Sequence, residues 1–161
     1  VQIRPLMQPI PESDFVSKGQ RQLLLTLRTG ASSLFRYLEQ TGKRDYNTCV
    51  LCDDELPEDH VHFLLDCDFY TEHRVTLEVA LMMLCASAGD DGSEWLRNWT
   101  SANRLARLQQ MLLMAVQSEK CSAFQVKIAK VFAEHVEKCY RDRRTELISR
   151  EPELQHTVGK F

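Results

Sequence analysis

Apolar residues recur along most of the chain at the spacing of three and four residues that is typical of amphipathic helices. Strand-like alternation never continues for more than a few residues. Helices are predicted over residues 13–30, 32–42, 70–86, 93–99, 103–117 and 121–148. Gly30 and Gly42 end the first two, because glycine readily adopts the conformation that closes a helix. The pattern therefore predicts an all-α protein, built as a compact multi-helix domain.

Three of these helices have distinctive apolar patterns. Residues 70–86 are apolar on nearly every side, which indicates a helix at the centre of the fold. The helix over 103–117 is predicted to align Leu105, Leu108, Leu112 and Val116. The last helix carries a stripe made of Phe124, Ile128, Val131, Phe132, Val136 and Tyr140. That stripe is wide enough for core packing, and because part of it keeps heptad spacing, a homodimer through the last helix is a second interpretation.

The segments around the helices differ in composition. Residues 1–12 hold three of the five prolines and are predicted to be an extended lead-in. Residues 89–93, GDDGS, are predicted to be a loop with a capping serine. Residues 150–161 are polar and are predicted to be a flexible tail. A chain of 161 residues suits one domain, so we assign residues 13–149 to one helical domain with a small irregular insert around Cys49.

The insert at residues 48–67, TCVLCDDELPEDHVHFLLDC, holds three cysteines and two histidines. Cys49, Cys52, His62 and Cys67 follow the spacing C-x2-C-x9-H-x4-C. Four such ligands make a closed tetrahedral Cys3His set, which is typical of one structural zinc ion. Metal binding would order the polar loop between the two ligand pairs, because binding energy in such sites is folding energy. A catalytic zinc would keep a position open to water, so we interpret this one as structural.

Two alternatives to this ligand set stay open. His60 competes with His62, although His62 has the better spacing to Cys67. A redox C-x-x-C pair is the other alternative, but such a pair is expected in a strand–helix unit that this sequence lacks. The remaining cysteines are spread through predicted helices, which favours a reducing compartment over a disulfide framework; they are Cys85, Cys121 and Cys139.

The motifs of this region form a recognisable series. The chain has LRTG at 27–30, CVLC at 49–52, the acidic residue Glu58, VHFLLDC at 61–67 and DFYTEHR at 68–74. With these motifs, the run from Leu24 to Arg74 resembles the zinc-binding region at the C-terminal end of non-long-terminal-repeat retrotransposon reverse transcriptases. The resemblance implies the same four zinc ligands. Val61 departs from the family pattern, in which an acidic residue often precedes the histidine.

The resemblance also implies a function. In that family the region engages template RNA or target DNA and does not polymerise, which suggests a non-catalytic nucleic-acid-binding accessory domain of a retroelement, or of a host protein derived from one. The candidate contacts flank the metal loop or end the last helix; they are Arg28, Arg36, Lys43, Arg44, Tyr46, Arg141, Arg143 and Arg144. The net charge of −3 and the acidic metal loop oppose phosphate binding.

A protein-protein interaction module derived from a retroelement is the alternative. Its candidate contacts are Trp95 and Trp99, whose spacing also suits core anchors. An enzyme is not expected, because the chain shows no Y-x-D-D motif and no catalytic set of carboxylates, cysteines or histidines.

The expected surroundings follow from the same features. Membrane partners are not expected, since no apolar run is long enough to span a bilayer. Small-molecule substrates are not expected either, because the sequence shows no catalytic set of residues. We expect an intracellular protein of the nucleus or cytoplasm. The chain begins at Val1, so we interpret it as an excised or processed piece in which a missing targeting segment means little.

Overall fold

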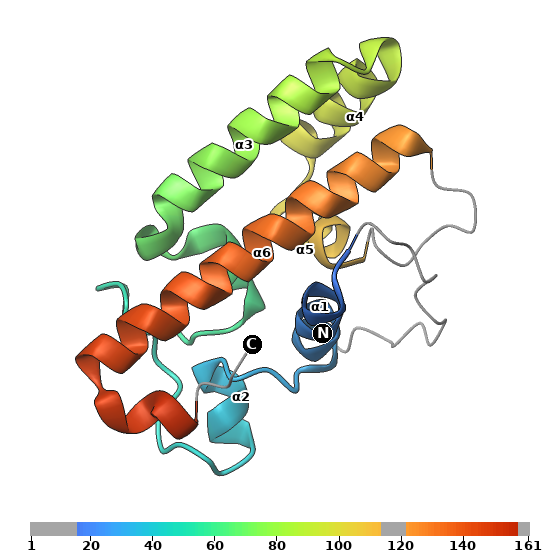
Figure 1. Cartoon of the computed structure of the whole chain (residues 1–161). Coiled ribbons are helices and arrows are strands. Elements are labelled where there is room, and N and C mark those ends of the chain that lie inside the picture. Colours follow the sequence, from blue (N-terminus) through green and yellow to red (C-terminus); the bar gives the residue numbers. More distant parts are fainter. Residues whose placement is uncertain (1–15, 114–121, 158–161) are drawn as a thin grey trace.

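The computed structural model describes residues 16–113 and 122–157 (Figure 1). Within these residues the chain forms helices and no strand, and an isolated antiparallel bridge joins Thr48 to Pro57. The prediction of an all-α fold is therefore confirmed. Four features predicted from the sequence lie outside the described residues. They are the lead-in at 1–12, the helix start at Ser13, Val116 in the fifth predicted helix, and Cys121.

The helices agree in outline with the predicted segments. They are α1 (Lys18–Thr29), α2 (Phe35–Gln40), the π-helix η1 (His62–Asp66), the 3-10 helix η2 (Asp68–Tyr70), α3 (Thr71–Ala86), α4 (Gly89–Ser101), α5 (Arg104–Leu113), α6 (Ala123–Arg150) and the 3-10 helix η3 (Pro152–His156). Capping boxes start α1 and α6, where Ser17 pairs with Gln20 and Ser122 with Gln125. α1 ends at Gly30, whose φ of 69° is the left-handed conformation that closes a helix.

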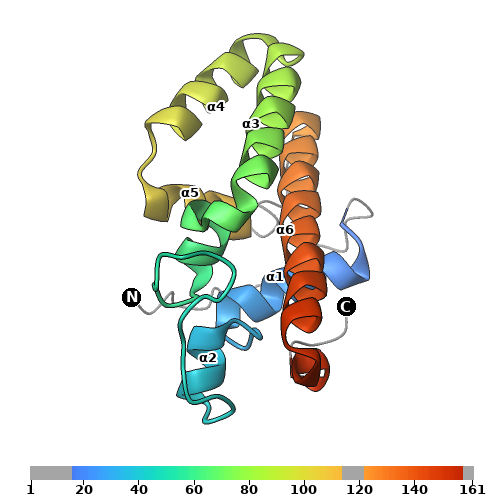
Figure 2. The ribbon, with the colours of Figure 1, turned by 90° about the vertical axis from the view of Figure 1, so that its left-hand side faces the viewer.

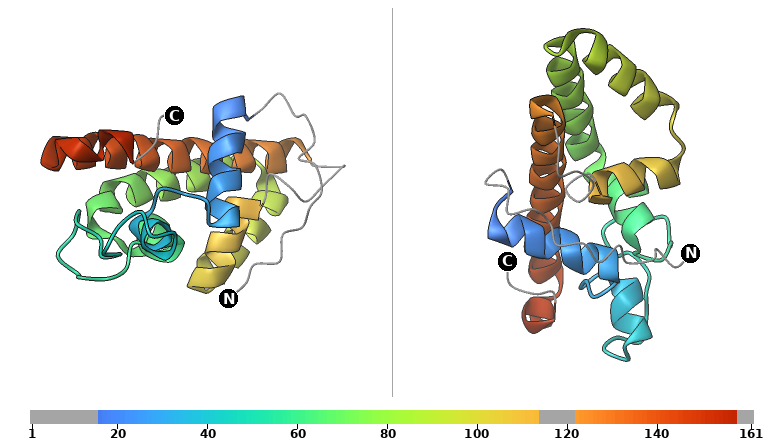
Figure 3. Two further views of the ribbon diagram at one scale, coloured as in Figure 1. Left: turned by 90° about the horizontal axis from the view of Figure 1, so that it is seen from below. Right: turned by 90° about the vertical axis from the view of Figure 1, so that its right-hand side faces the viewer.

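The long helix α6 is the spine of the fold. α3 lies beside it (Figures 1 and 2), α4 folds back from the end of α3, and α1 crosses α6 at a steep angle (Figure 3). The buried face of α6 packs against α1, α3 and α5, and includes Ile128, Phe132, Val136, Cys139, Tyr140 and Leu147. Most of the predicted stripe is therefore covered within the chain, which leaves little of it for the homodimer considered from the sequence.

α3 is not the central helix that its composition indicates. Only Leu77, Leu81 and Cys85 are buried on it. Its outward side exposes large apolar residues, with exposed fractions of 58% for Val75, 50% for Val79, 55% for Met82 and 70% for Met83. The physical reason is that the neighbours of α3, chiefly α6 and α4, cover only part of its circumference, so apolar residues at every angle cannot all be covered.

The predicted loop at 89–93 is wrong, because these residues form the first turns of α4. The glycine that suggested a loop is needed for close packing instead. A Cβ on Gly92 would lie 2.1 Å from the carbonyl oxygen of Cys85 on α3, so only glycine fits where the two helices meet. Beyond it, Trp99 is 1% exposed and Trp95 stacks on it with a centroid distance of 5.7 Å. The pair anchors the core, which removes Trp99 as a surface contact.

The C-terminal segment is described as far as Thr157. η3 folds back against α6, and Leu154 is 8% exposed within it. Glu151 accepts a hydrogen bond from Arg44 at 3.3 Å, which ties this turn to the segment after α2. The predicted flexible tail therefore begins with a packed 3-10 helix rather than with frayed chain.

Candidate metal centre

The first ligand pair lies on a tight loop between α2 and η1. The loop is closed by backbone hydrogen bonds, from Cys49 N to Leu56 O at 2.9 Å and from Glu58 N to Asn47 O at 2.8 Å. The Leu51 N–H points at Cys49 Sγ, 3.5 Å away. Because a backbone N–H directed at sulfur stabilises negative charge there, the loop favours a thiolate at Cys49.

The second ligand pair lies at the two ends of the π-helix η1. Cys67 N donates to His62 O at 2.8 Å, across five residues. A π-turn is wider than an α-turn, so residues five apart return to nearly the same side. Asp59 caps the start of this turn by accepting from His62 N at 3.0 Å. The H-x4-C spacing is thus matched by an uncommon helix that brings imidazole and thiol together.

The four predicted ligands meet in one cluster. Their ligand atoms all lie within 4.8 Å of one another, with Cys49 Sγ 3.8 Å from Cys67 Sγ and Cys52 Sγ 3.3 Å from His62 Nε2. A tetrahedral ion with Zn–S bonds of about 2.3 Å would separate two sulfurs by about 3.8 Å. Cys49, His62 and Cys67 are buried. These four residues can therefore bind one metal ion, as the spacing predicts.

The contacts within the cluster favour a thiolate at Cys49 and favour the protonated forms of the other three ligands. The hydrogen bond from the Cys67 thiol lowers the pKa of Cys49 to about 4, and the same contact raises the pKa of Cys67. The nearby Cys49 thiolate raises the pKa of His62. Burial raises the pKa of Cys52. The remaining protons must leave when a metal binds, because only thiolate and neutral imidazole are ligands.

His60 has a different role. Its Nδ1 lies 2.8 Å from the hydroxyl of Tyr37, and the two rings pack with a centroid distance of 4.8 Å. Burial lowers the pKa of His60 to about 4, so the ring is neutral at pH 7. The structure places His62, not His60, among the three cysteines.

A buried ion pair joins the metal loop to the spine. Both Glu58 and Arg143 are almost fully buried, and their side chains meet in a bidentate contact, Nε–Oε1 at 2.6 Å and Nη2–Oε2 at 2.7 Å. Glu58 Oε2 also accepts from Phe35 N at 2.8 Å, and Arg143 Nη2 donates to Ser33 O at 2.9 Å. Glu58 is therefore a buried partner of Arg143 and does not belong to the exposed acidic tip of the loop, which consists of Asp53, Asp54 and Glu55.

The structure buries some of the predicted nucleic-acid contacts and leaves others at the surface. Arg143 is completely buried and is removed from any outer surface. Arg44 is enclosed between the rings of Phe35 and Tyr46, 3.7 and 3.8 Å from their centroids. Arg28 is half-buried, and its Nε donates to the carbonyl of Leu112. These three arginines therefore support the fold.

The other predicted contacts stay at or near the surface. Lys43 and Arg141 are exposed, Tyr46 is 41% exposed, and Arg36 and Arg144 are half-buried. They come from α2, the loop after it and the C-terminal half of α6. Arg141 and Arg144 both line a small cavity of about 70 Å³, whereas Arg36, Lys43 and Tyr46 do not border it.

Three arginines outside the predicted set line a larger cleft. Arg74, Arg104 and Arg107 border a cavity of about 180 Å³ between η1, α3, α4 and α5. The sequence carries no signal for this grouping, because the residues belong to separate helices that only the fold brings together.

In comparisons with protein-family models, curated proteins and solved structures, no match to this chain was found. The likeness to retrotransposon reverse transcriptases therefore rests on the motif residues alone. Among the described helices, none combines the length and the apolar character that crossing a membrane requires.

Proposed function

We propose that this protein is a non-catalytic nucleic-acid-binding domain whose fold is held by one structural zinc ion. The observation that carries the proposal is the closed ligand cluster. Three thiols and one imidazole form a set that favours zinc over the oxygen-preferring ions magnesium and calcium. Four protein ligands complete a tetrahedral shell, so water has no position on the ion, and the metal serves to order the loop.

Two features support nucleic acid as the ligand. The motifs over residues 24–74 resemble a retroelement region that engages nucleic acid, and arginines gather on surfaces next to the metal loop. The acidic tip of the loop, with exposed Asp53, Asp54 and Glu55, works against it. A ligand that approaches from the arginine-bearing sides would keep this acidic tip away from its phosphates.

The zinc part of the proposal is tested by metal content. Purified protein is expected to hold one zinc per chain, and removal of the metal by a chelator is expected to lower its melting temperature steeply. Protein that holds no zinc, or that melts unchanged after chelation, would refute a structural zinc ion.

The nucleic-acid part is tested by binding to a labelled RNA hairpin and to duplex DNA across a salt series. Affinity is expected to fall steeply as salt rises, because phosphate contacts release counterions. Lys43→Glu is a usable charge reversal, since Lys43 is exposed, whereas a change at the enclosed Arg44 would disturb the fold. The zinc-loaded protein failing to bind at low salt would exclude this function.

A second candidate is a protein-interaction module, favoured by the exposed apolar side of α3. Val75, Val79, Met82 and Ala86 follow one another at steps of four, three and four residues, which is the seam spacing of two paired helices. A second copy of this chain offers the same seam in antiparallel orientation. Sedimentation velocity decides: a dimer that Val79→Glu dissociates supports this candidate, and a monomer at high concentration rejects it.

A further inference from the structure

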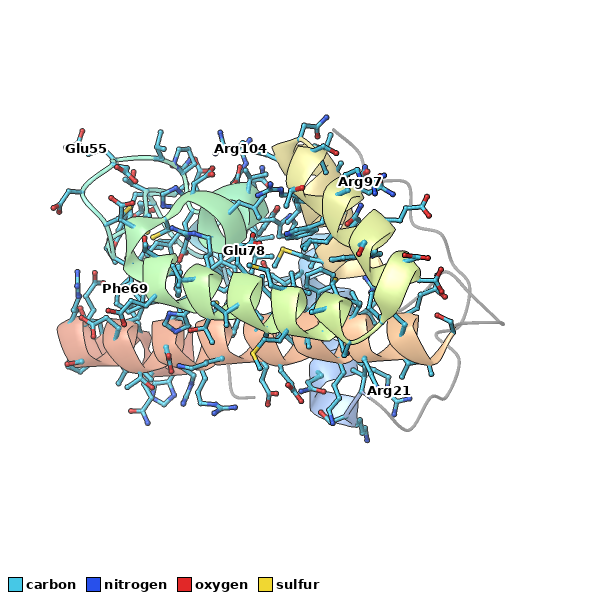
Figure 4. The ribbon with its side chains drawn as sticks, turned by 90° about the horizontal axis from the view of Figure 1, so that it is seen from above. Arg21, Glu55, Phe69, Glu78, Arg97 and Arg104 are labelled. Carbon is cyan, nitrogen blue, oxygen red and sulfur yellow. The ribbon has the colours of Figure 1, made fainter. Side chains whose placement is uncertain are left out.

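We infer that the cleft lined by Arg74, Arg104 and Arg107 binds the phosphates of a nucleic-acid backbone; this deepens the proposed function and rests on it. The cleft lies between η1 and α3 on one side and α4 and α5 on the other, with a volume of about 180 Å³. Figure 4 shows this region from above and labels Glu78 on α3, Arg97 on α4 and Arg104 at the start of α5.

Neutral oxygens hold two of the three guanidinium groups. Arg74 donates to Cys67 O at 2.8 Å and to Thr71 Oγ1 at 3.0 Å. Arg107 donates to Trp99 O at 3.1 Å and to the backbone oxygen of Thr100 at 3.0 Å. These contacts fix the orientation of both groups without neutralising their charge. A fixed guanidinium with N–H groups to spare is a preferred partner of phosphate.

The two carboxylates in the cleft, Asp66 and Glu78, offset only part of the charge of the three arginines. Glu78 receives the indole N–H of Trp99 at 3.2 Å from each oxygen and lies 4.0 Å from Arg107. Asp66 pairs with Arg104, whose side chain is 67% exposed. The side chain of Asp66 is 24% exposed, but the Arg104 end of the pair is open to water. The pair is therefore partly screened, and a phosphate can replace Asp66 as the partner of Arg104.

The floor of the cleft strengthens an anion contact. Leu64, Leu77, Trp99 and Met111 line it and are buried. Apolar walls exclude water, and charges attract more strongly where water is excluded. The cleft is also joined to the metal centre, because the Cys67 carbonyl that orients Arg74 belongs to a ligand residue and Asp66 precedes it. Loss of the metal is therefore expected to misplace one wall of the cleft.

The test compares two matched charge reversals by fluorescence anisotropy with the labelled RNA hairpin. Arg104 and Lys130 are 67% and 58% exposed, and they make surface ion pairs with Asp66 and with Glu134, respectively. Arg104→Glu is expected to weaken binding at least tenfold and to flatten the salt dependence by about one phosphate contact. Lys130→Glu, which lies outside the cleft and outside the predicted contacts, is expected to weaken binding less than threefold. Melting curves and zinc content show that both variants are folded.

A third variant gives a change in the opposite direction, which a folding defect cannot produce. Asp66→Asn removes the carboxylate that competes for Arg104, and binding is expected to tighten by about threefold, the scale of one exposed ion pair. Tightening supports the assignment, and unchanged or weaker binding by folded, zinc-loaded Asp66→Asn counts against it.

The outcomes separate this inference from the proposed function. If the unaltered protein binds RNA but Arg104→Glu and Lys130→Glu weaken binding equally, the cleft assignment fails and the function stands. If the unaltered protein does not bind nucleic acid, both fail. Inorganic phosphate is expected to displace the RNA more strongly than chloride does at equal ionic strength, and phosphate that competes no better than chloride would count against a phosphate-binding cleft.

Discussion

The buried pair of Glu58 and Arg143 offers the sharpest test of the fold. Glu58→Gln keeps the size of the side chain and one acceptor oxygen but removes the charge. Arg143, with a side chain 0% exposed, is then left as a buried cation without a counter-charge. Removing one partner of a buried pair costs about 3–5 kcal/mol, because the remaining charge stays out of water. A domain of this size is stable by about 5–15 kcal/mol, so the loss is a large share of the total.

The assay is urea unfolding of zinc-saturated protein, followed by the fluorescence of the core tryptophans. Glu134→Gln is the matched control, because Glu134 is 55% exposed and pairs with Lys130 at 3.9 Å on the surface of α6. Its cost is expected to be below about 0.5 kcal/mol. Combining Glu58→Gln with Arg143→Met leaves no stranded charge, so the double variant should cost about 2 kcal/mol less than the two single changes added together.

Two results would refute this reasoning. Glu58→Gln that costs as little as Glu134→Gln would show that the two side chains do not form a desolvated pair in solution. Strictly additive single changes would show that the charges do not depend on each other. Zinc content is measured on each variant, because Glu58 lies between Cys52 and His62 in the chain and a lost metal would add its own cost.

Three further changes probe other parts of the molecule. Cys67→Ser is expected to lose the metal and to lower the free energy of unfolding by several kcal/mol. Cys85→Ser changes a cysteine outside the cluster and should keep one metal per chain. Metal analysis and melting curves check both variants. Gly92→Ala should cost at least about 1–3 kcal/mol in urea unfolding, since its Cβ would overlap the Cys85 carbonyl, while Gly19→Ala in α1 meets no closer atom than 3.9 Å and should be neutral or stabilising. Burial, aided by nearby positive charges, lowers the pKa of His135 to about 4. As pH falls below about 6.5, the unfolded chain therefore binds a proton at this histidine before the folded protein does, and about 2 kcal/mol of stability should be lost between pH 7 and pH 5. His135→Gln should lack that part of the pH dependence of stability.

Local signals account for the parts of the structure that the sequence predicts well. Gly30 ends α1 because its backbone must be left-handed there, and the four metal ligands are grouped by spacing alone. Such features depend on a few neighbouring residues, so they can be recognised without knowing the fold. The last helix is also found at nearly its full length, since its apolar stripe repeats over many turns.

The sequence predictions are wrong where contacts between segments far apart in the chain determine the local structure. GDDGS has the composition of a loop, yet Gly92 is required because α3 comes close to it. The apolar residues of α3 predict a central helix, but composition does not tell how many sides have neighbours. Arg143 looks like a surface cation near the end of a helix, and its burial depends on Glu58, which lies 85 positions away in sequence.

The same long-range contacts explain why a small metal loop can govern a whole domain. Glu58 lies inside the loop and pairs with α6, and the Cys67 carbonyl orients Arg74 at the start of α3. Both contacts require the loop in its folded shape, and its polar tip has little apolar surface with which to hold that shape. A bound metal would supply that stabilisation, and through these two contacts it would set both the packing of the spine and the wall of the arginine cleft. Metal loss should therefore weaken nucleic-acid binding through the fold, even though the proposed phosphate contacts do not touch the ion.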